Sequence, residues 1–536
     1  MFSFLRCTDL AAMTATILDG LDLPTLVRRA SETFGDRVGL VIDATGERLS
    51  FAQIHDRADA LAGRLSRLGV LRGDRVAVML ANGAEFPLLW LAIARLGAVI
   101  VPINLAAQVE DLTHLISTAS AKVAIVESGS LELMTRVQAR CVDLAEVLTI
   151  DQLHRLLAAE LPQLSCDPHR ALNLQFTSGT SGKPKACVLS HGYWLGIAEQ
   201  AITSEWSLSS EDVLLTAQPF FYMDPQWNFV VALALGAPLV VLDRFSPSSF
   251  MEKVRAHDVT FFYCLGVMPT LLLKTPIDPR DTDNRLRLVL CSGIPAGEHA
   301  ALERRFGAPW YEIYGMTETG GATIAMTPTD HERLVGTGAL GRATPRVALR
   351  LCDEAGQDVG VDEVGEILLQ GEGFMDCYWQ DPEATAEVWR GGWFHTGDLA
   401  SRSASGIVTF HGRSKDVIKR SGENISAAEV EEVLMGSDLV RLAAVLAVPD
   451  EIRGEEAKAF VVLAHVDGSD LAVLAERLTR HCRDALAAFK VPRYWEFVDE
   501  LPRTPSEKVA KAELSRAATG IDVLALRPST PAGSTT

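Results

Sequence analysis

The sequence predicts an α/β protein in which a large N-terminal part, built of βαβ lobes with parallel sheets, is followed by a small α+β part. Three observations support this. The chain has 536 residues, which is too many for a single hydrophobic core. Helical and strand patterns alternate through most of the chain, which favours parallel sheets with covering helices. After about residue 412 the pattern changes to short strands around one long helix.

The alternation is clearest near the N-terminal end. From Ser50 the apolar residues recur every three or four positions, which predicts a helix, and residues 75–80 follow as a short apolar strand. Residues 85–96 are again helical, and residues 98–103 again predict a strand. Buried strands are predicted later at 238–242 and 287–291.

The C-terminal part predicts strands at 442–448 and 458–464, a helix at 469–487 and a strand at 495–498. A unit of this size forms a domain of its own.

We place the large domain at residues 13–412 and the small domain at residues 413–520. Residues 1–12 show no clear pattern, so Met13 is a candidate start. The last segment, 521–536, is rich in Pro, Ser and Thr near its end and is expected to be a disordered tail.

The composition excludes several functional classes. Lys and Arg number 50 against 69 Asp and Glu, and the net charge of −19 argues against a nucleic-acid partner. The nine cysteines form no C-x-x-C pair, which favours a reducing, cytoplasmic location and argues against metal or disulfide roles. The most apolar stretch, 87–104, contains Arg95 and Gly97 and therefore predicts a helix and a strand of the core, not a membrane span.

A segment rich in hydroxyl groups and glycine follows the predicted strand 172–176. Its hydroxyls, glycines and lysines are typical of a cradle for a polyphosphate, although a polar surface turn would have the same composition. It is not a Walker loop, because Pro184 stands where that motif needs Ser or Thr. The candidate ligands are Thr177, Ser178, Gly179, Thr180, Ser181, Gly182 and Lys185.

A second glycine pattern, Gly336–Gly341, has the spacing G-x-G-x-x-G. Charged residues 331–333 precede it and Pro345 follows it, so the strand before and the helix after that a dinucleotide site needs are both missing. We therefore predict no dinucleotide site here.

The hydroxyl-rich loop resembles the signature of the adenylate-forming superfamily, which includes acyl-CoA synthetases, luciferases and the adenylation domains of peptide synthetases. The resemblance covers about residues 24 to 515 and implies an acetyl-CoA synthetase-like fold with a mobile C-terminal domain. Further segments similar to family motifs follow in the expected order at 314–318, 393–398, 412–416, 418–426, 488–492 and 502–508.

The resemblance implies a catalytic role for Lys508 in adenylation, a contact of Thr317 with the α-phosphate and a Mg²⁺ ion held by Glu318. Asp398 and Arg413 are the implied ribose ligands. The remaining implied ATP or AMP ligands are Gly293, Glu312, Tyr314 and Gly315, which act together with the loop.

The second half of the implied reaction depends on the small domain. Lys415 is the implied hinge, and Ser421, Gly422 and Glu423 line the implied channel for coenzyme A. The implied activity is an AMP-forming acid–thiol ligase that uses ATP, Mg²⁺ and coenzyme A. The family usually has glycine where this chain has Glu507 and Ala186. Two alternatives therefore stay open, an enzyme that loads a carrier protein and a relative that binds nucleotide without adenylating.

The acyl pocket is expected from Tyr222, Asp224, Trp227, Gly293 and Gly320. The segment 223–227 resembles carnitine or crotonobetaine-CoA ligases. Asp224 beside aromatic rings is typical of a site for a cationic or hydroxylated acid, but it is also typical of a helix cap, and we favour the cap.

Several reactive residue types are expected to be structural. We predict core positions for Cys187 and Cys291 and structural roles for His191 and His395. The expected partners are the acid and coenzyme A, with no membrane association, and a homodimer stays open.

Overall fold

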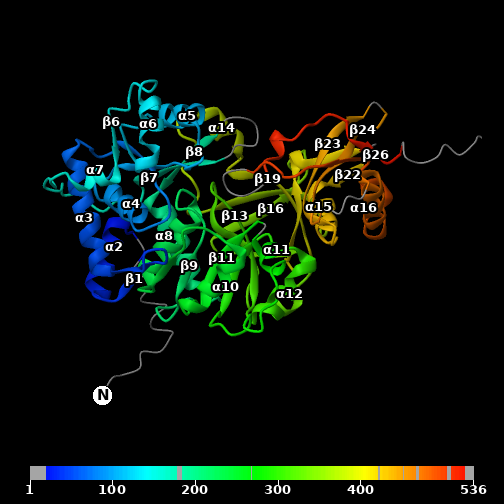
Figure 1. Ribbon diagram of the computed structural model, residues 1–536, viewed down its shortest axis with the longest axis horizontal. Coiled ribbons are helices and arrows are strands. Elements are labelled where there is room, and N and C mark those ends of the chain that lie inside the picture. The colour runs from blue at the N-terminus through cyan, green and yellow to red at the C-terminus, as the bar shows by residue number, and fades with distance from the viewer. Residues whose placement is uncertain are drawn as a thin grey trace, which may run out of the picture. The chain divides into compact units, whose positions relative to one another are not determined.

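The computed structural model describes Leu18 and residues 20–177, 184–266, 268–420, 423–450, 452–465, 470–503 and 509–524 (Figure 1). The chain forms two compact units. The first contains the residues up to 348 together with 369–394, and the second contains 349–368 and the residues from 395 onward.

One sheet of the first unit has the strand order β6-β5-β3-β4-β7-β8. Its strands pair in parallel except for β7 and β8, which are antiparallel. The fully buried β5 is apolar throughout, as expected of a parallel strand covered on both faces. The strands are β3 (Arg75–Met79), β4 (Val99–Pro102), β5 (Val123–Val126), β6 (Glu146–Thr149), β7 (Ala171–Thr177) and β8 (Lys185–Ser190).

A second group of strands in the first unit has the order β15-β14-β13-β12-β11-β9-β10-β1-β2. The central strands are parallel, and β2, β14 and β15 are antiparallel to their neighbours. The strands are β1 (Val38–Ile42), β2 (Glu47–Ser50), β9 (Leu214–Thr216), β10 (Leu239–Val241), β11 (Phe261–Leu265), β12 (Leu288–Ser292), β13 (Trp310–Met316), β14 (Gly320–Ala325) and β15 (Ala339–Ala343).

Helices of the first unit alternate with these strands and pack their apolar faces on them. The predicted helix after Ser50 is confirmed as α3. Its first turn is closed by a capping box, in which Gln53 N–H donates to Ser50 Oγ and Ser50 N–H donates to Gln53 Oε1. The helices are α2 (Leu23–Phe34), α3 (Phe51–Arg67), α4 (Glu85–Arg95), α5 (Val109–Ala119), α6 (Leu131–Gln138), α7 (Ile150–His154), α8 (His191–Thr203), α9 (Met223–Leu235), α10 (Pro247–Ala256), α11 (Met268–Leu273), α12 (Ala296–Phe306), α13 (His331–Leu334) and α14 (Pro382–Val388).

The second unit is the predicted α+β arrangement, with α15 beside β23 and α16 beside α15 (Figure 1). Its own core contains Val430, Val445 and Trp495. By residue number, β18 belongs to the first unit, and β16, β17 and β19 each contain residues of both units. The elements are β16 (Val347–Cys352), β17 (Gly365–Gly371), β18 (Trp389–Arg390), β19 (Trp393–Arg402), β20 (Val408–Arg413), β21 (Val417–Arg420), β22 (Glu423–Ser426), α15 (Ala427–Met435), β23 (Val440–Asp450), β24 (Gly454–Leu463), α16 (Leu471–Ala485), β25 (Tyr494–Phe497) and β26 (Ile521–Asp522).

The predicted tail needs a correction at its start. Ile521 and Asp522 pair with Trp495 and Tyr494 as β26, so ordered structure continues beyond 520. The rest of the predicted tail, from 525 onward, lies outside the described residues, as do residues 1–17.

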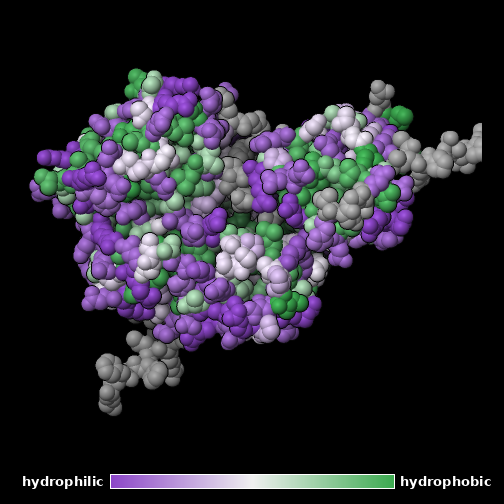
Figure 2. Space-filling view, in the orientation of Figure 1, coloured by the Kyte–Doolittle hydropathy of each residue, from purple (hydrophilic) through white to green (hydrophobic). Residues whose placement is uncertain are grey.

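The stretch 87–104 forms α4 and β4, as predicted. Within the described ranges no helix is long and apolar enough to cross a membrane. The face shown in Figure 2 carries mostly hydrophilic side chains, and its apolar side chains form small separate patches.

The second glycine pattern has the reverse context of a dinucleotide site, with α13 before it and β15 within it. Gly341 has φ 109°, and a Cβ there would come within 2.0 Å of the Ala325 carbonyl oxygen. Close strand packing explains this glycine.

Candidate active site

The predicted phosphate loop joins β7 to β8. The two strands are in register at its base, where Thr177 stands opposite Lys185. Antiparallel pairing of β7 with β8 brings the two described ends of the loop, Thr177 and Lys185, together. Residues 178–183, which include Ser178, Gly179, Thr180, Ser181 and Gly182, lie outside the described residues.

Glu318 lies in the turn between β13 and β14. Its side chain is only 8% exposed, and its Oε1 accepts a hydrogen bond of 3.0 Å from the Tyr378 hydroxyl. The neighbouring Thr317 carbonyl accepts a 2.9 Å bond from Tyr193 Oη. A buried carboxylate is the hard oxygen ligand that Mg²⁺ prefers, so the predicted metal role fits this position.

Tyr378 also links Glu318 to the phosphate loop. The Lys185 ammonium lies 5.2 Å from the centroid of the Tyr378 ring. The thiol of Cys187, two residues along β8, is fully buried, and burial together with the nearby Glu318 raises its pKa. The structure therefore brings Thr177, Lys185 and Glu318 into one neighbourhood of the first unit. The predicted core position of Cys187 is confirmed.

Gly315 on β13 lies against the backbone of Gly320 and Gly321 on β14. A Cβ at this position would lie 2.1 Å from the Gly321 carbonyl oxygen, a distance no side chain tolerates. The glycine is required by packing, and it also lines the cavity described below.

Glu312 and Gly293, both predicted nucleotide ligands, contact each other. The carboxylate oxygens of Glu312 accept bonds of 2.7 Å from the N–H groups of Gly293 and Ile294. Burial raises the pKa of Glu312 to about 8, although these two donors favour its anion. In this structure the carboxyl group holds the turn that follows β12.

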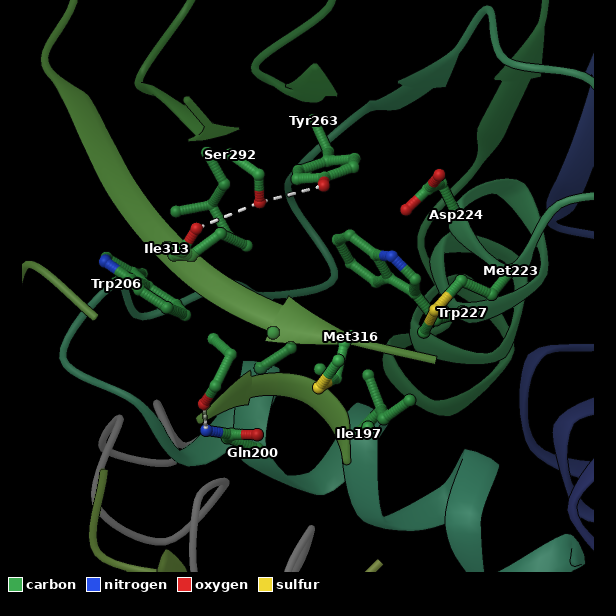
Figure 3. A pocket seen from close by; sticks show the side chains of 16 residues that line it. Ile197, Gln200, Trp206, Met223, Asp224, Trp227, Tyr263, Ser292, Ile313 and Met316 are labelled. Carbon is green, nitrogen blue, oxygen red and sulfur yellow. Dashed lines mark hydrogen bonds between the residues drawn. The ribbon is translucent and has the colours of Figure 1, made fainter. Parts of the chain in front are cut away.

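A cavity opens between α8, α9 and the ends of β11 to β14 (Figure 3). Asp224, Trp227 and Tyr263 lie together at one end of the view, and Trp206 and Gln200 lie at the other. Of the described lining residues, only Asp224 carries a formal charge at neutral pH. The lining consists of Ile197, Gln200, Ala201, Trp206, Met223, Asp224, Trp227, Tyr263, Leu290, Ser292, Ile313, Gly315, Met316, Gly320, Gly321 and Ala322.

The aromatic end of this cavity has fixed polar contacts. Tyr263 Oη donates to Ser292 Oγ at 3.0 Å, and Ser292 Oγ donates to the Ile313 carbonyl at 2.9 Å. The rings of Trp227 and Tyr263 meet edge to face at 5.4 Å between centroids. Burial and the nearby Asp224 raise the pKa of Tyr263.

The helix-cap hypothesis for Asp224 is wrong. The N-cap of α9 is Tyr222, which makes no side-chain capping bond, and Asp224 lies within the first turn. Of the five residues predicted for the acyl pocket, Asp224, Trp227 and Gly320 line this cavity, whereas Tyr222 and Gly293 are not among its lining residues. The Tyr222 ring packs on Phe221 instead, with centroids 4.5 Å apart.

The two predicted ribose ligands are neighbours in the second unit. Asp398 on β19 stands opposite Arg413 on β20, and Arg413 Nε lies 3.2 Å from Asp398 Oδ1. The Asp398 side chain is buried, whereas Arg413 is 40% exposed in its side chain. The guanidinium therefore orients a buried carboxylate.

The predicted structural histidines are confirmed as parts of fixed networks. His191 is fully buried and its Nδ1 accepts a 3.1 Å bond from Leu23 N–H, and burial lowers its pKa to about 4. His395 Nδ1 lies 3.0 Å from Glu366 Oε2.

Several predicted residues lie outside the described residues. Lys508, Ser421 and Gly422 are among them, and the side chains of Lys415 and Glu423 are too. Near Lys508, the described residues Arg503 and Val509 form an isolated antiparallel bridge.

A group of His299, Glu303 and His331 has the residue types of a metal site. However, His299 Nε2 lies 2.8 Å from the Trp310 carbonyl and Nδ1 accepts from Gly336 N–H, so both ring nitrogens already have backbone partners. Glu303 also accepts from Trp310 N–H. These contacts make the group a structural network that joins α12 to β13.

Sequence reasoning missed Tyr378 and much of the cavity. Tyr378 is not part of a motif with an obvious chemical meaning. Ile197, Gln200 and Trp206 lie outside the segments that are similar to family motifs. A sequence signal pointed to Asp224, Trp227 and Gly320, and not to these three residues of the cavity wall.

Comparisons with known proteins agree with this geometry. The family described as "AMP-binding enzyme" matches residues 27–379, and "AMP-binding enzyme C-terminal domain" matches residues 429–508. A crotonobetaine/carnitine–CoA ligase of Escherichia coli is 30% identical over 524 residues, which cover 93% of this chain and 99% of that protein.

Two solved structures show the same fold. The o-succinylbenzoate-CoA synthetase of Bacillus subtilis, in complex with its acyl-adenylate intermediate, is 25% identical with a TM-score of 0.83 and covers 92% of this chain and 99% of that one. MatB of Rhodopseudomonas palustris with bound ATP is 27% identical with a TM-score of 0.81 and covers 91% and 97%.

Proposed function

The chain belongs to the AMP-binding enzyme family and is an AMP-forming acyl-CoA synthetase that uses ATP, Mg²⁺ and coenzyme A, and from this premise we propose how its residues divide the work and which acid it takes. The large domain, residues 13–412, activates the acid. The small domain, residues 413–520, supplies Lys508 for the first step and the thiol channel for the second. The pairing of Thr177 with Lys185, and the contacts of Tyr378 with both Lys185 and Glu318, support the first assignment.

In the first step a carboxylate oxygen of the acid attacks the α-phosphorus of ATP, and the bond to pyrophosphate breaks. Two anions must meet, so cationic groups have to be in place beforehand. Lys185 and Lys508 supply the positive charge, the hydroxyl and backbone N–H groups of the loop 177–182 supply hydrogen bonds, and Thr317 contacts the α-phosphate. The Mg²⁺ ion held by Glu318 supplies further charge neutralisation on the phosphate oxygens.

The residues proposed for the nucleoside end of ATP are given for each unit separately. In the second unit, Asp398, oriented by Arg413, accepts hydrogen bonds from the ribose hydroxyls. In the first unit, the proposed nucleotide ligands are Tyr314, Gly315 and the Gly293 turn that Glu312 holds.

In the second step the thiol of coenzyme A attacks the acyl carbonyl and AMP leaves. Lys415 acts as the hinge about which the small domain turns, and Ser421, Gly422 and Glu423 then line the channel. The thiol of a carrier protein would need the same channel, and a homodimer is compatible with this scheme. We assign the enzyme to the cytoplasm, where ATP and coenzyme A are available.

The acid bound in the cavity carries a cationic group distant from its carboxylate. The single observation that supports this is the placement of Asp224, the only charged lining residue described, beside the rings of Trp227 and Tyr263. Carboxylates pair with ammonium groups, and aromatic faces attract quaternary nitrogen. The E. coli relative is named for acids of this kind.

The test compares matched acids in acid-dependent ATP–pyrophosphate exchange. One acid carries a trimethylammonium group, and its control has the same shape with a carbon atom in place of the nitrogen. We expect kcat/KM to be at least about tenfold higher for the cationic acid. Equal values would contradict the proposed acid class without affecting the ligase activity. Addition of coenzyme A or of a carrier protein to the active pair then identifies the acceptor.

A further inference from the structure

Residues 375–379 lie along β8, the strand that leaves the phosphate loop. The N–H of Asp376 donates to the Val188 carbonyl at 2.9 Å, Val188 N–H donates to the Cys377 carbonyl at 2.9 Å, and Trp379 N–H donates to the Ala186 carbonyl at 2.8 Å. Tyr378 forms an antiparallel bridge with Cys187. We call residues 375–379 the strap.

The strap also holds the turn that carries Glu318. Met375 N–H donates to the Glu318 carbonyl at 2.8 Å, and Tyr378 Oη donates to Glu318 Oε1 at 3.0 Å. Both the backbone and the carboxylate of Glu318 are thus fixed by one short segment. Since Tyr378 is itself only 7% exposed, its ring has little freedom to turn away.

Tyr378 contacts two charges of opposite sign through different parts of its side chain. Its hydroxyl binds the Glu318 carboxylate, and its ring stands 5.2 Å from the Lys185 ammonium. The carboxylate oxygen of Glu318 can only accept, so the Tyr378 hydroxyl donates in this bond. A carboxylate offers about four acceptor sites, so this bond is compatible with metal ligation.

We propose that Tyr378 is a positioning residue that fixes the Glu318 carboxylate and the Lys185 ammonium in one arrangement, and so couples metal binding to the binding of the ATP phosphates. This rests on the proposed roles of Glu318 and Lys185. Mg²⁺ demands near-ideal octahedral geometry, so a carboxylate that is already oriented binds it with less loss of side-chain freedom.

The test measures this coupling without turnover. The dissociation constant of ATP is determined by calorimetry in the absence of acid, once with excess EDTA and once with saturating Mg²⁺. The value in EDTA divided by the value in Mg²⁺ reports how much the metal strengthens ATP binding. Tyr378→Phe keeps the ring and removes only the hydroxyl. We expect the ratio to fall about three- to tenfold, with less than about a twofold change in EDTA.

A second variant separates the two contacts. Tyr378→Leu also removes the ring beside Lys185, and we expect it to weaken ATP binding in EDTA as well. The control is Tyr311→Phe, which removes a tyrosine hydroxyl on β13 at a residue with no proposed role in ATP or metal binding. We expect it to keep the wild-type ratio. The melting temperature of every variant is recorded to verify folding.

Glu318→Gln distinguishes the possible failures. If it abolishes the Mg²⁺ effect while Tyr378→Phe keeps the full wild-type ratio, the positioning role is refuted and the metal role of Glu318 stands. If Glu318→Gln itself keeps the ratio, the proposed metal ligand is wrong and the inference fails with it. An equal loss of ATP affinity with and without metal in Tyr378→Phe would also overturn the coupling.

Discussion

Glu312 shows how one buried carboxyl group makes stability depend on pH. Its pKa of about 8 in the folded protein exceeds the ordinary value of 4.5, because burial disfavours the anion. Its contribution to the free energy of unfolding is greatest below pH 4.5 and decreases as pH rises through 8, since the folded state favours the protonated form.

The pH dependence can be tested with Glu312→Gln, which cannot titrate. We expect the melting temperature of the wild type to fall relative to that of the variant as pH rises from 5 to 8. Parallel curves for the two proteins in thermal unfolding would show that Glu312 does not titrate in this range. A constant offset between the curves is expected in addition, because the amide loses one of the two backbone hydrogen bonds.

Asp224 carries the prediction about acid selectivity. Asp224→Asn keeps the size of the side chain and removes its charge, so kcat/KM for a trimethylammonium acid should fall about ten- to a hundredfold. The uncharged acid of the same shape should change by less than about threefold. Asp143→Asn, at an exposed position of the same unit, serves as the control. Similar losses of kcat/KM for both acids in the exchange assay would show that Asp224 does not discriminate between a cationic and an uncharged acid.

At the scale of elements, the paired strands β13 and β14 line one side of the cavity proposed for the acid. Their pairing depends on Gly315, where an added methyl group would lie 2.1 Å from the Gly321 carbonyl oxygen. The backbone would have to move, which also displaces the turn that carries Glu318.

Gly315→Ala should therefore lower the free energy of unfolding by about 1–3 kcal/mol and reduce adenylation. The matched control is Gly297→Ala in α12, where nothing lies within 4 Å of the added carbon. There we expect a gain of up to about 1 kcal/mol, because alanine favours the helix. Urea unfolding measures both, and wild-type stability of Gly315→Ala would contradict the argument.

The elements themselves followed closely from the sequence. Capped helices such as α3 and buried strands such as β4 are set by local periodicity, so their positions could be predicted. Asp224 could not be placed, because its side chain satisfies either a helix end or a cavity and only the packing of α9 decides. Tyr378 was missed for a related reason, since its partners Lys185 and Glu318 meet it only in the folded chain.

At the scale of the whole molecule, the proposed scheme requires Lys508 in the first step only. We expect Lys508→Ala to lower acid-dependent pyrophosphate exchange by at least about a hundredfold. Thioester formation from a supplied acyl-adenylate should stay within about threefold of wild type. Both rates can be measured on the same preparation, and an equal loss of both would exclude a lysine that serves one half-reaction. The roles of Lys508, Lys415 and the channel residues stay predictions, because the family segments imply them and the described residues do not include their side chains.

The residues that line the cavity proposed for the acid all belong to the first unit, whereas Asp398 and Arg413 belong to the second. Under the proposed scheme, we expect substitutions in the cavity wall to leave the proposed ribose contacts and the thiol half-reaction unaltered. The substrate specificity of such an enzyme can change through a few substitutions around Asp224 and Trp206. An engineer can likewise confine a library to that small set of codons and read the outcome as changed substrate choice with an intact catalytic cycle.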